Sequence, residues 1–336
     1  MSITANCRLI LMGWVASLAL TTPVAAQDAS MNEPVRPPQR LCIYYGQPSE
    51  VNGSKGDIVQ ATATFMNCDI VILGDGLEHP QHEDHGSAIR IIATLNEAGK
   101  MVFGYVDLGV STQNLDETTI RAYVDEWQRI GAKGIFFDDA GYDYAVTRIR
   151  QNAMVGYAHE LGLSVFMNAW DIDDVLGELD EANQPNSSHL QPGDWYLAES
   201  WLIASGAYQP LEAWSKKADK ALHYSRTKGI SIAAVSTAGV KKAGARDNRQ
   251  RKFRLASWGA AMYGLSAWQW TDAAYGAADN RLRIYDFGPP YGVRFIEDQV
   301  QYSGDSAVVK AYSRATDAGR IFVKSTGATA WGSFRK

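Results

Sequence analysis

Gly134-Ile135-Phe136-Phe137-Asp138-Asp139 is the most informative segment of this sequence. Its four uncharged residues are typical of a strand buried on both faces, and the two adjacent acids indicate where that strand ends. Because consecutive side chains of a strand point to opposite faces, only one of the two carboxyls can point straight into a site at that end. The segment therefore predicts a buried parallel strand with a functional carboxylate at its carboxyl end.

The same organisation repeats along the chain. Short apolar runs alternate with stretches of helical periodicity at 118–130, 211–228 and 250–263, a pattern typical of βαβ units. Eight strands of this kind fit a closed (β/α)8 TIM barrel, an α/β fold, better than an open doubly wound sheet. The predicted strands are 42–45, 69–74, 101–108, 134–139, 164–170, 195–200, 231–236 and 265–270.

The amino-terminal residues depart from this pattern. Arg8, a following apolar run and the small residues Val24-Ala25-Ala26 indicate a signal peptide over 1–26. The apolar run is shorter than the about 20 residues that a membrane span needs. Residues 27–40 are polar and proline-bearing and predict a linker. We therefore expect a secreted or periplasmic protein with no membrane contact once the signal is removed.

The carboxyl-terminal residues also differ from the barrel pattern. The βα alternation stops after Asp272, and 308–313, 320–324 and 328–334 show the period-two pattern of half-buried antiparallel strands. We expect a barrel over 41–284 and a small antiparallel β extension over 285–336.

Composition and missing motifs exclude several classes of function. The 336 residues have a formal net charge of -5 and no stripe of basic residues alternating with aromatics, so we expect no nucleic-acid partner. No GxGxxG or P-loop follows a strand, and no GxSxG elbow is present. We expect a monomer that needs no cofactor.

Two cysteines, Cys42 and Cys68, remain after the signal peptide. Neither follows the carboxyl end of a strand, which argues against thiol catalysis. Cys42 begins the first predicted strand and Cys68 precedes the second, so neighbouring strands would bring both thiols to one end of the barrel. A disulfide and two buried free thiols both remain open from the sequence.

Acids follow the second, third, fourth, fifth, sixth and eighth predicted strands. Enzymes with this barrel have their active sites at the carboxyl ends of the strands. A single Asp there often caps the next helix, but so many acids in one barrel mouth are harder to explain as caps. Glycoside hydrolysis needs two carboxyls across the scissile bond, one that donates a proton and one that stays ionised. Asp138 and Glu199 suit these roles, and Asp139 is expected to support them.

Other polar and aromatic residues lie at the same strand ends. An aromatic side chain there can belong to the core, but Trp is rarely buried completely and sugar rings stack on exposed indoles. The residues expected to bind substrate are Tyr44, Asp75, Tyr105, Asp107, Asn168, Trp170, Trp201, Gln269 and Trp270.

The loop 76–85 contains three histidines and three acids. Their spacing differs from that of a two-histidine zinc helix, and Pro80 argues against a helix in this loop. Zinc also needs a tetrahedral set of ligands, which a short polar loop rarely supplies by itself. We therefore expect this loop to contact substrate or solvent, and we predict no metal site.

Four segments resemble the barrel shared by the spherulin-4-like and endo-α-1,4-polygalactosaminidase-like glycoside hydrolases. The similarity covers about residues 41–272, and the Gly-Ile-Phe-Phe-Asp-acid strand end is its most specific part. The segments are, in order, Ile43-Tyr44-Tyr45, Gly104-Tyr105-Val106, Trp127 and the hexapeptide ending in Asp139.

The resemblance implies that Asp138 and Glu199 are the catalytic carboxylates. Asp139 stands where the spherulin-4 group has a second acid, usually a Glu that is one methylene longer. The resemblance also implies endo-cleavage of polymers of α-1,4-linked galactosamine or N-acetylgalactosamine. Two alternatives share the fold: a glycosidase of other linkage specificity, and a non-catalytic carbohydrate-binding or cell-envelope protein.

Overall fold

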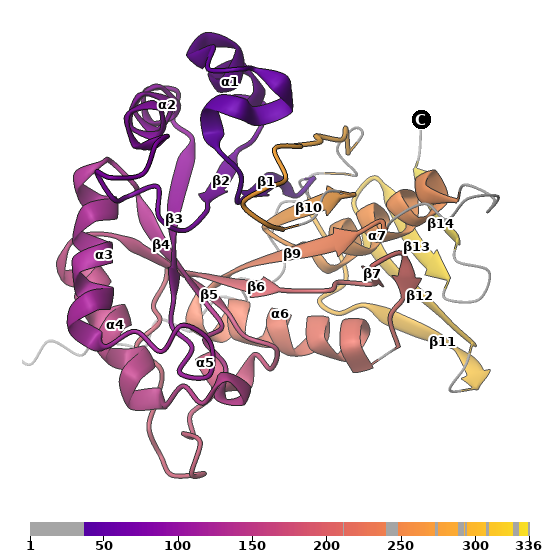
Figure 1. Cartoon of the computed structure of the whole chain (residues 1–336). Coiled ribbons are helices and arrows are strands. Elements are labelled where there is room, and N and C mark those ends of the chain that lie inside the picture. Colours follow the sequence, from indigo (N-terminus) through magenta and orange to yellow (C-terminus); the bar gives the residue numbers. More distant parts are fainter. Residues whose placement is uncertain are drawn as a thin grey trace, which may run out of the picture.

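The computed structural model describes residues 37–210, 212–239, 248–272, 275–287, 292, 294–306, 309–324 and 329–334. Eight parallel strands in these residues close into a barrel in the order β1-β10-β9-β6-β5-β4-β3-β2 (Figure 1), which confirms the predicted fold class. The strands are β1 (Gln39–Tyr44), β2 (Ile70–Leu73), β3 (Met101–Asp107), β4 (Gly134–Asp138), β5 (Ser164–Asn168), β6 (Trp195–Ala198), β9 (Ser231–Thr237) and β10 (Ala267–Thr271). The predicted signal peptide and most of the predicted linker lie outside the described residues.

Helices connect the strands and cover the outside of the barrel (Figure 1). The predicted helices at 118–130 and 250–263 correspond to α3 and α7, and the predicted helix at 211–228 is a π turn, Glu212–Lys216, followed by α6. The α-helices are α1 (Ile58–Phe65), α2 (His85–Glu97), α3 (Glu117–Arg129), α4 (Arg148–Glu160), α5 (Asp173–Leu176), α6 (Lys217–Lys228) and α7 (Arg249–Tyr263); 3-10 turns are Pro48–Gly53 and Tyr142–Tyr144. None of the helices in the described ranges is long and apolar enough to cross a membrane.

Helix α3 shows how side chains fix a helix on the barrel. The Asp116 side chain accepts a hydrogen bond from the backbone of Thr119 and caps the first turn. On the buried face, Trp127 donates a 2.9 Å hydrogen bond to the Tyr105 carbonyl of β3. A Cβ atom at Gly104 would lie only 2.0 Å from the Trp127 ring. The glycine is therefore required for the indole to lie against the strand.

Alternating side chains of each barrel strand enter two separate cores. On β1 and β4, Ile43 and Phe136 belong to the cluster inside the barrel, whereas Cys42 and Phe137 belong to the cluster between barrel and helices. Side chains two positions apart on a strand point to the same face. The alternation therefore decides which residue after each strand can point into the barrel mouth.

Cys42 and Cys68 form a disulfide, which the sequence had left open. Both residues are buried in the outer core, with Cα atoms 6.0 Å apart. The bond joins β1 to the segment just before β2, away from the carboxyl ends of the strands.

A four-stranded antiparallel sheet follows the barrel: β11 (Gln301–Ser306), β12 (Val309–Thr316), β13 (Gly319–Lys324) and β14 (Thr329–Phe334). It packs on the barrel through Tyr312, whose ring lies 4.8 Å from that of Trp214, and through Arg314, which donates to the Met262 carbonyl of α7. The sequence predicted three of these strands. It did not predict β11, whose residues QYSGDS lack apolar alternation.

Candidate active site

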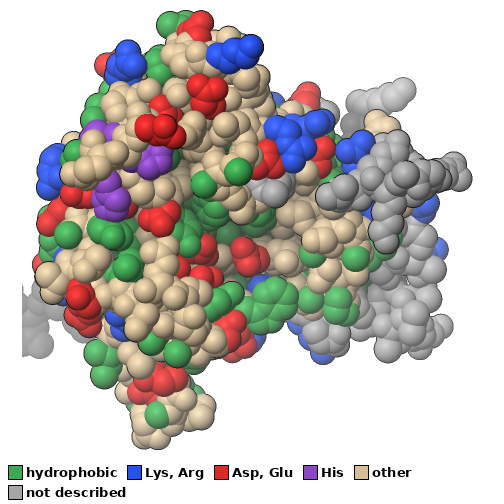
Figure 2. All heavy atoms as spheres, viewed as in Figure 1, with side chains coloured by type: hydrophobic (Ala, Val, Ile, Leu, Met, Phe, Trp, Pro, Cys, Tyr) green, Lys and Arg blue, Asp and Glu red, His purple; other side chains and the backbone are tan. Residues whose placement is uncertain are grey.

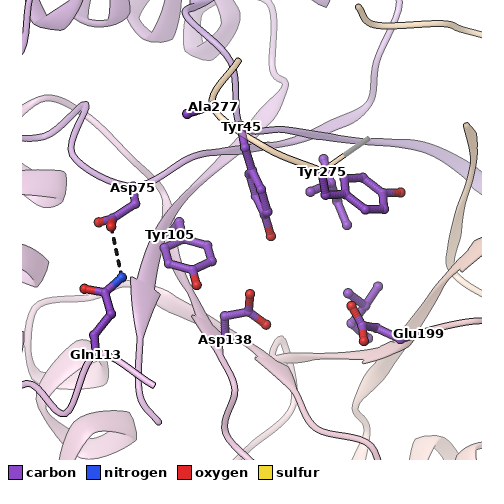
Figure 3. A pocket seen from close by; sticks show the side chains of 10 residues that line it. Tyr45, Asp75, Tyr105, Gln113, Asp138, Glu199, Tyr275 and Ala277 are labelled. Carbon is purple, nitrogen blue, oxygen red and sulfur yellow. Dashed lines mark hydrogen bonds between the residues drawn. The ribbon is translucent and has the colours of Figure 1, made fainter. Parts of the chain in front are cut away.

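A cavity of about 410 Å³ opens at the carboxyl ends of the barrel strands (Figure 3). Asp138 is the last residue of β4, two positions after Phe136 of the barrel interior, and Glu199 stands two positions after Leu197 of β6. Both carboxyls consequently point into this cavity. Its lining is Ile43, Tyr45, Asp75, Tyr105, Gln113, Asp138, Leu197, Glu199, Tyr275 and Ala277.

Asn168 connects the two carboxyls. It ends β5, the strand that lies between β4 and β6. Its side-chain amide donates a 2.6 Å hydrogen bond to Asp138 Oδ1, and it also acts to lower the pKa of Glu199. The backbone N–H of Asp139 donates to the same Asp138 oxygen at 3.0 Å. The predicted binding residue Asn168 therefore holds the Asp138 carboxyl in place.

The environment of the two carboxyls alters their protonation. Burial, followed by the charge of Glu199, raises the pKa of Asp138 to about 6, although hydrogen bonds from Asn168 and Tyr105 oppose this shift. Burial also raises the pKa of Glu199, and the Asn168 hydrogen bond and the Lys217 charge act in the lowering direction. Two coupled carboxyls with shifted pKa values make this cavity a candidate site for acid–base chemistry.

Asp139 lies beside this pair in a strained backbone conformation, with a φ of 50°. Left-handed backbone at a non-glycine residue is uncommon and often occurs at functional sites. Burial and the charges of Asp138 and Asp107 raise the pKa of Asp139 to about 6. Its side chain does not line the cavity but interacts with Tyr144 and Thr112.

Two other predicted binding residues, Asp75 and Tyr105, lie in the cavity wall. Asp75 accepts a 3.0 Å hydrogen bond from Gln113, which is drawn in Figure 3. The Tyr105 hydroxyl acts to lower the pKa of Asp138, and Tyr45 packs edge-on against the Tyr105 ring at 5.3 Å. Tyrosine and carboxyl groups thus line this side of the cavity.

Two further predicted residues support the site from behind. Asp107 is buried and accepts hydrogen bonds from the Gly109 backbone at 2.8 Å and the Thr112 hydroxyl at 2.7 Å, so it shapes the loop after β3. Gln269 is also buried, and its Oε1 accepts a hydrogen bond from the Tyr275 hydroxyl. Gln269 therefore orients a tyrosine of the cavity and does not line the cavity itself.

Three residues expected to bind substrate lie in the core instead: Tyr44, Trp201 and Trp270. Tyr44 and Trp270 occupy outward-facing strand positions, where they pack on Phe65 and Phe253. The parity of β1 places the next residue, Tyr45, in the cavity. The sequence could have predicted the position of Tyr45, because Tyr45 follows the barrel-interior residue Ile43 by two positions. Tyr275 lies outside any strand or helix, so no periodic pattern could have predicted its place in the cavity.

Trp201 has a structural role next to Glu199. Its indole is completely buried and packs edge-on against Trp214 and Tyr263. Its backbone N–H donates to the Val235 carbonyl of β9 at 2.8 Å. Trp201 therefore anchors the turn that carries Glu199.

Trp170 is the one predicted tryptophan with an exposed ring, at 52% exposure. It lines a second hollow of about 280 Å³, formed with Lys217 and Lys220 of α6. Lys217 Nζ lies 4.5 Å from the centroid of the Trp170 ring. Lys217 was not among the predicted residues, because a lysine at the start of a helix has no distinguishing sequence pattern.

The histidine-rich loop is tied to the fold by its own side chains. His79 Nδ1 lies 2.6 Å from Glu126 Oε2 of α3, and His85 Nδ1 lies 2.8 Å from the Leu77 carbonyl oxygen. In the described ranges, no three His, Cys, Asp or Glu side chains are grouped as metal ligands would be.

The face shown in Figure 2 is hollowed at its centre, where acidic side chains gather.

Comparisons with known proteins support the fold. No protein-family model and no curated protein matches the sequence. An Anoxybacillus α-amylase is similar in structure, with a TM-score of 0.52, 10% identity and coverage of 85% of this chain and 86% of that one. AmyP in complex with maltose gives a TM-score of 0.50, 10% identity and the same coverage. The glycoside hydrolase domain of PelA from Pseudomonas aeruginosa gives a TM-score of 0.43 and 14% identity, with coverage of 73% of this chain and 99% of that one. The chain therefore has a barrel fold that glycoside hydrolases also have.

Proposed function

We propose that this protein is an exported glycoside hydrolase that cleaves a polysaccharide internally, with Asp138 and Glu199 as its catalytic carboxyls. The observation that carries the proposal is the cavity at the strand ends, which the partly exposed carboxyls of Asp138 and Glu199 both line, with Asn168 donating a hydrogen bond to Asp138. A carbohydrate-binding protein needs no such pair of carboxyls with raised pKa values.

The arrangement supplies the chemistry of glycosidic cleavage. Asp138 keeps its proton up to about pH 6 and donates it to the glycosidic oxygen as the bond to the anomeric carbon breaks. The Glu199 carboxylate either attacks the anomeric carbon or removes a proton from the water that does so. A carboxyl separation of about 5–5.5 Å gives retention and about 6.5–9.5 Å gives inversion.

We further propose a substrate of α-1,4-linked galactosamine or N-acetylgalactosamine, on the basis of the sequence resemblance. In an α-linked sugar the 2-acetamido group lies on the same face as the leaving oxygen and cannot attack from the opposite side. The enzyme must therefore provide both carboxyls. The exposed Trp170 ring would stack on a sugar further along the chain.

The test compares Asp138→Asn and Glu199→Gln with the parent enzyme. Each substitution removes an ionisable group at nearly constant volume, so each should abolish release of reducing ends without changing the unfolding temperature. Glu160→Gln, at the exposed end of α4, is the matched control and should keep full turnover. Near-native turnover in either active-site variant would refute the assignment.

The substrates should include a purified α-1,4-galactosamine polymer, its N-acetylated form and starch. Cleavage of starch alone would indicate a glycosidase of different linkage specificity. Retention of a polymer without any products would favour the non-catalytic binding protein.

A further inference from the structure

The second hollow, of about 280 Å³, lies at the turn after β5. Its lining includes Trp170 and Asp171 from that turn and Lys220 from α6. Trp170 follows Asn168 by two residues, a span of at most about 7 Å. Asn168 Nδ2 in turn lies 2.6 Å from Asp138 Oδ1. A polymer bound at the catalytic carboxyls therefore comes within reach of this hollow.

The indole of Trp170 forms an apolar wall of the hollow. Of the tryptophans whose exposure the structure describes, Trp170 alone is exposed, at 52%. Lys217 Nζ, 4.5 Å from the ring centroid, supports the ring from one side. An aromatic ring that is held in place and still open to solvent can stack on the apolar C–H face of a sugar. The hollow is slightly smaller than the about 300–1,000 Å³ of sites for whole drug-sized ligands, so it suits one sugar unit.

Polar groups lie at the rim of the same hollow. Lys220 Nζ is 3.3 Å from Asp171 Oδ1 and 2.6 Å from Asp173 Oδ2, and its third proton has no acceptor among the described residues. Asp171 Oδ1 also accepts from the Asp173 backbone N–H, whereas no described residue donates to Asp171 Oδ2. The side chains of Lys220 and Asp171 are 41% and 53% exposed. A donor and an acceptor therefore stand side by side, as two neighbouring hydroxyl groups of a sugar require.

We propose that this hollow is a second sugar-binding subsite, in which one uncharged hexose or N-acetylhexosamine unit stacks on Trp170 and hydrogen-bonds Asp171 and Lys220. The inference rests on the proposed function and names the class of sugar that the polymer places there. The charges of Asp171 and Lys220 compensate each other, so the pair favours neither an anionic nor a cationic sugar. A free amine would also meet the positive charges of Lys216 and Lys217 in the lining.

The first test is hydrolysis of a long polymer by Trp170→Ala. Loss of the stacking contact should raise KM about tenfold and change kcat less than about twofold, because the ring does not touch the reacting carboxyls. Trp170→Phe keeps an aromatic ring and should restore most of the affinity. Val59→Ala is the matched control, because Val59 is 81% exposed on α1, which follows the strand opposite β5 in the barrel. A parent-like KM in Trp170→Ala would overturn the inference.

The second test does not depend on turnover. The ¹⁵N-indole signal of Trp170 is observed in Glu199→Gln and assigned by its absence when Trp170→Phe is added. The probes are maltotriose, an N-acetylated α-1,4-galactosamine oligomer and the same oligomer without acetyl groups. At least one of the two uncharged probes should shift the signal to saturation, and which one does so distinguishes hexose from N-acetylhexosamine. The cationic oligomer should bind at least about tenfold more weakly.

Two results of this titration would overturn the inference: no saturable shift with either uncharged probe, or equally tight binding of the cationic oligomer. The outcome is separable from that of the proposed function. A saturable shift of the Trp170 signal in a protein that hydrolyses nothing would refute the hydrolase and leave the subsite. Hydrolysis by the parent, with an unmoved Trp170 signal, would refute the subsite and leave the hydrolase.

Discussion

Asn168 Nδ2 lies 2.6 Å from Asp138 Oδ1, across two neighbouring strands of the barrel. The Asn168 side chain also favours the ionised form of Glu199. A neutral donor can stabilise either carboxylate without adding a competing charge. The middle strand of three thus carries a group that acts on the carboxyls of the two strands beside it.

Replacement of Asn168 by Ala should reduce kcat by roughly 100-fold, because small displacements of catalytic groups have effects of that size. Substrate affinity, read from KM where chemistry limits turnover, should change much less. Asn67→Ala, at the exposed end of α1, serves as the control with unchanged kcat. A parent-like kcat for Asn168→Ala would show that the carboxyls hold their positions without the amide.

The pKa of Asp138 should fall in Glu199→Gln. The negative charge of Glu199 helps raise this pKa to about 6, and removing that charge makes ionisation of Asp138 easier. Titration of ¹³C-labelled aspartate should therefore show a lower Asp138 midpoint in the variant, with Glu160→Gln as control. In the parent enzyme, the alkaline limb of kcat/KM should lie near pH 6, because Asp138 must hold its proton to act as the acid. The same Asp138 midpoint in the parent and in Glu199→Gln would show that the two groups are not coupled.

Glu78→Gln should stabilise the protein more at pH 8 than at pH 5. Glu78 is fully buried, and burial raises its pKa to about 8. Between its ordinary pKa and pH 8 the unfolded chain loses this proton while the folded protein keeps it, so folding becomes less favourable as pH rises. The glutamine variant lacks this penalty. Each kcal/mol by which the variant increases the free energy of unfolding should raise the unfolding temperature by about 2–4 °C. Equal effects at both pH values would contradict a neutral Glu78 in the folded state.

Gly104→Ala should destabilise the barrel by about 1–3 kcal/mol, the usual cost of overpacking a core. The added methyl would meet the Trp127 ring at 2.0 Å, and the indole is held there by its hydrogen bond to the Tyr105 carbonyl. Gly156→Ala in α4 is the control, because its Cβ would meet nothing within 4 Å. That variant should be neutral or slightly stabilised, since alanine favours helix over glycine. Urea unfolding measures both, and equal stability of the two variants would contradict the packing argument.

The amino-acid sequence alone was enough to predict the barrel, because strand burial and helix periodicity are local patterns. All eight predicted barrel strands are present, including β4, where the uncharged run stops at Asp138 as expected. The candidate pair Asp138 and Glu199 was also visible in the sequence, since each follows an apolar strand.

Tertiary structure decided which neighbours of that pair reach the cavity. Neighbouring residues of a strand point to opposite faces, so Tyr44 lies in the core whereas Tyr45, one residue later, lines the cavity. Packing on Trp214 and Tyr263 buries Trp201, although it stands two residues after Glu199. Lys217 meets Trp170 only because the turn after β5 and the start of α6 come together in space. These contacts join residues distant in the chain, so no local pattern encodes them.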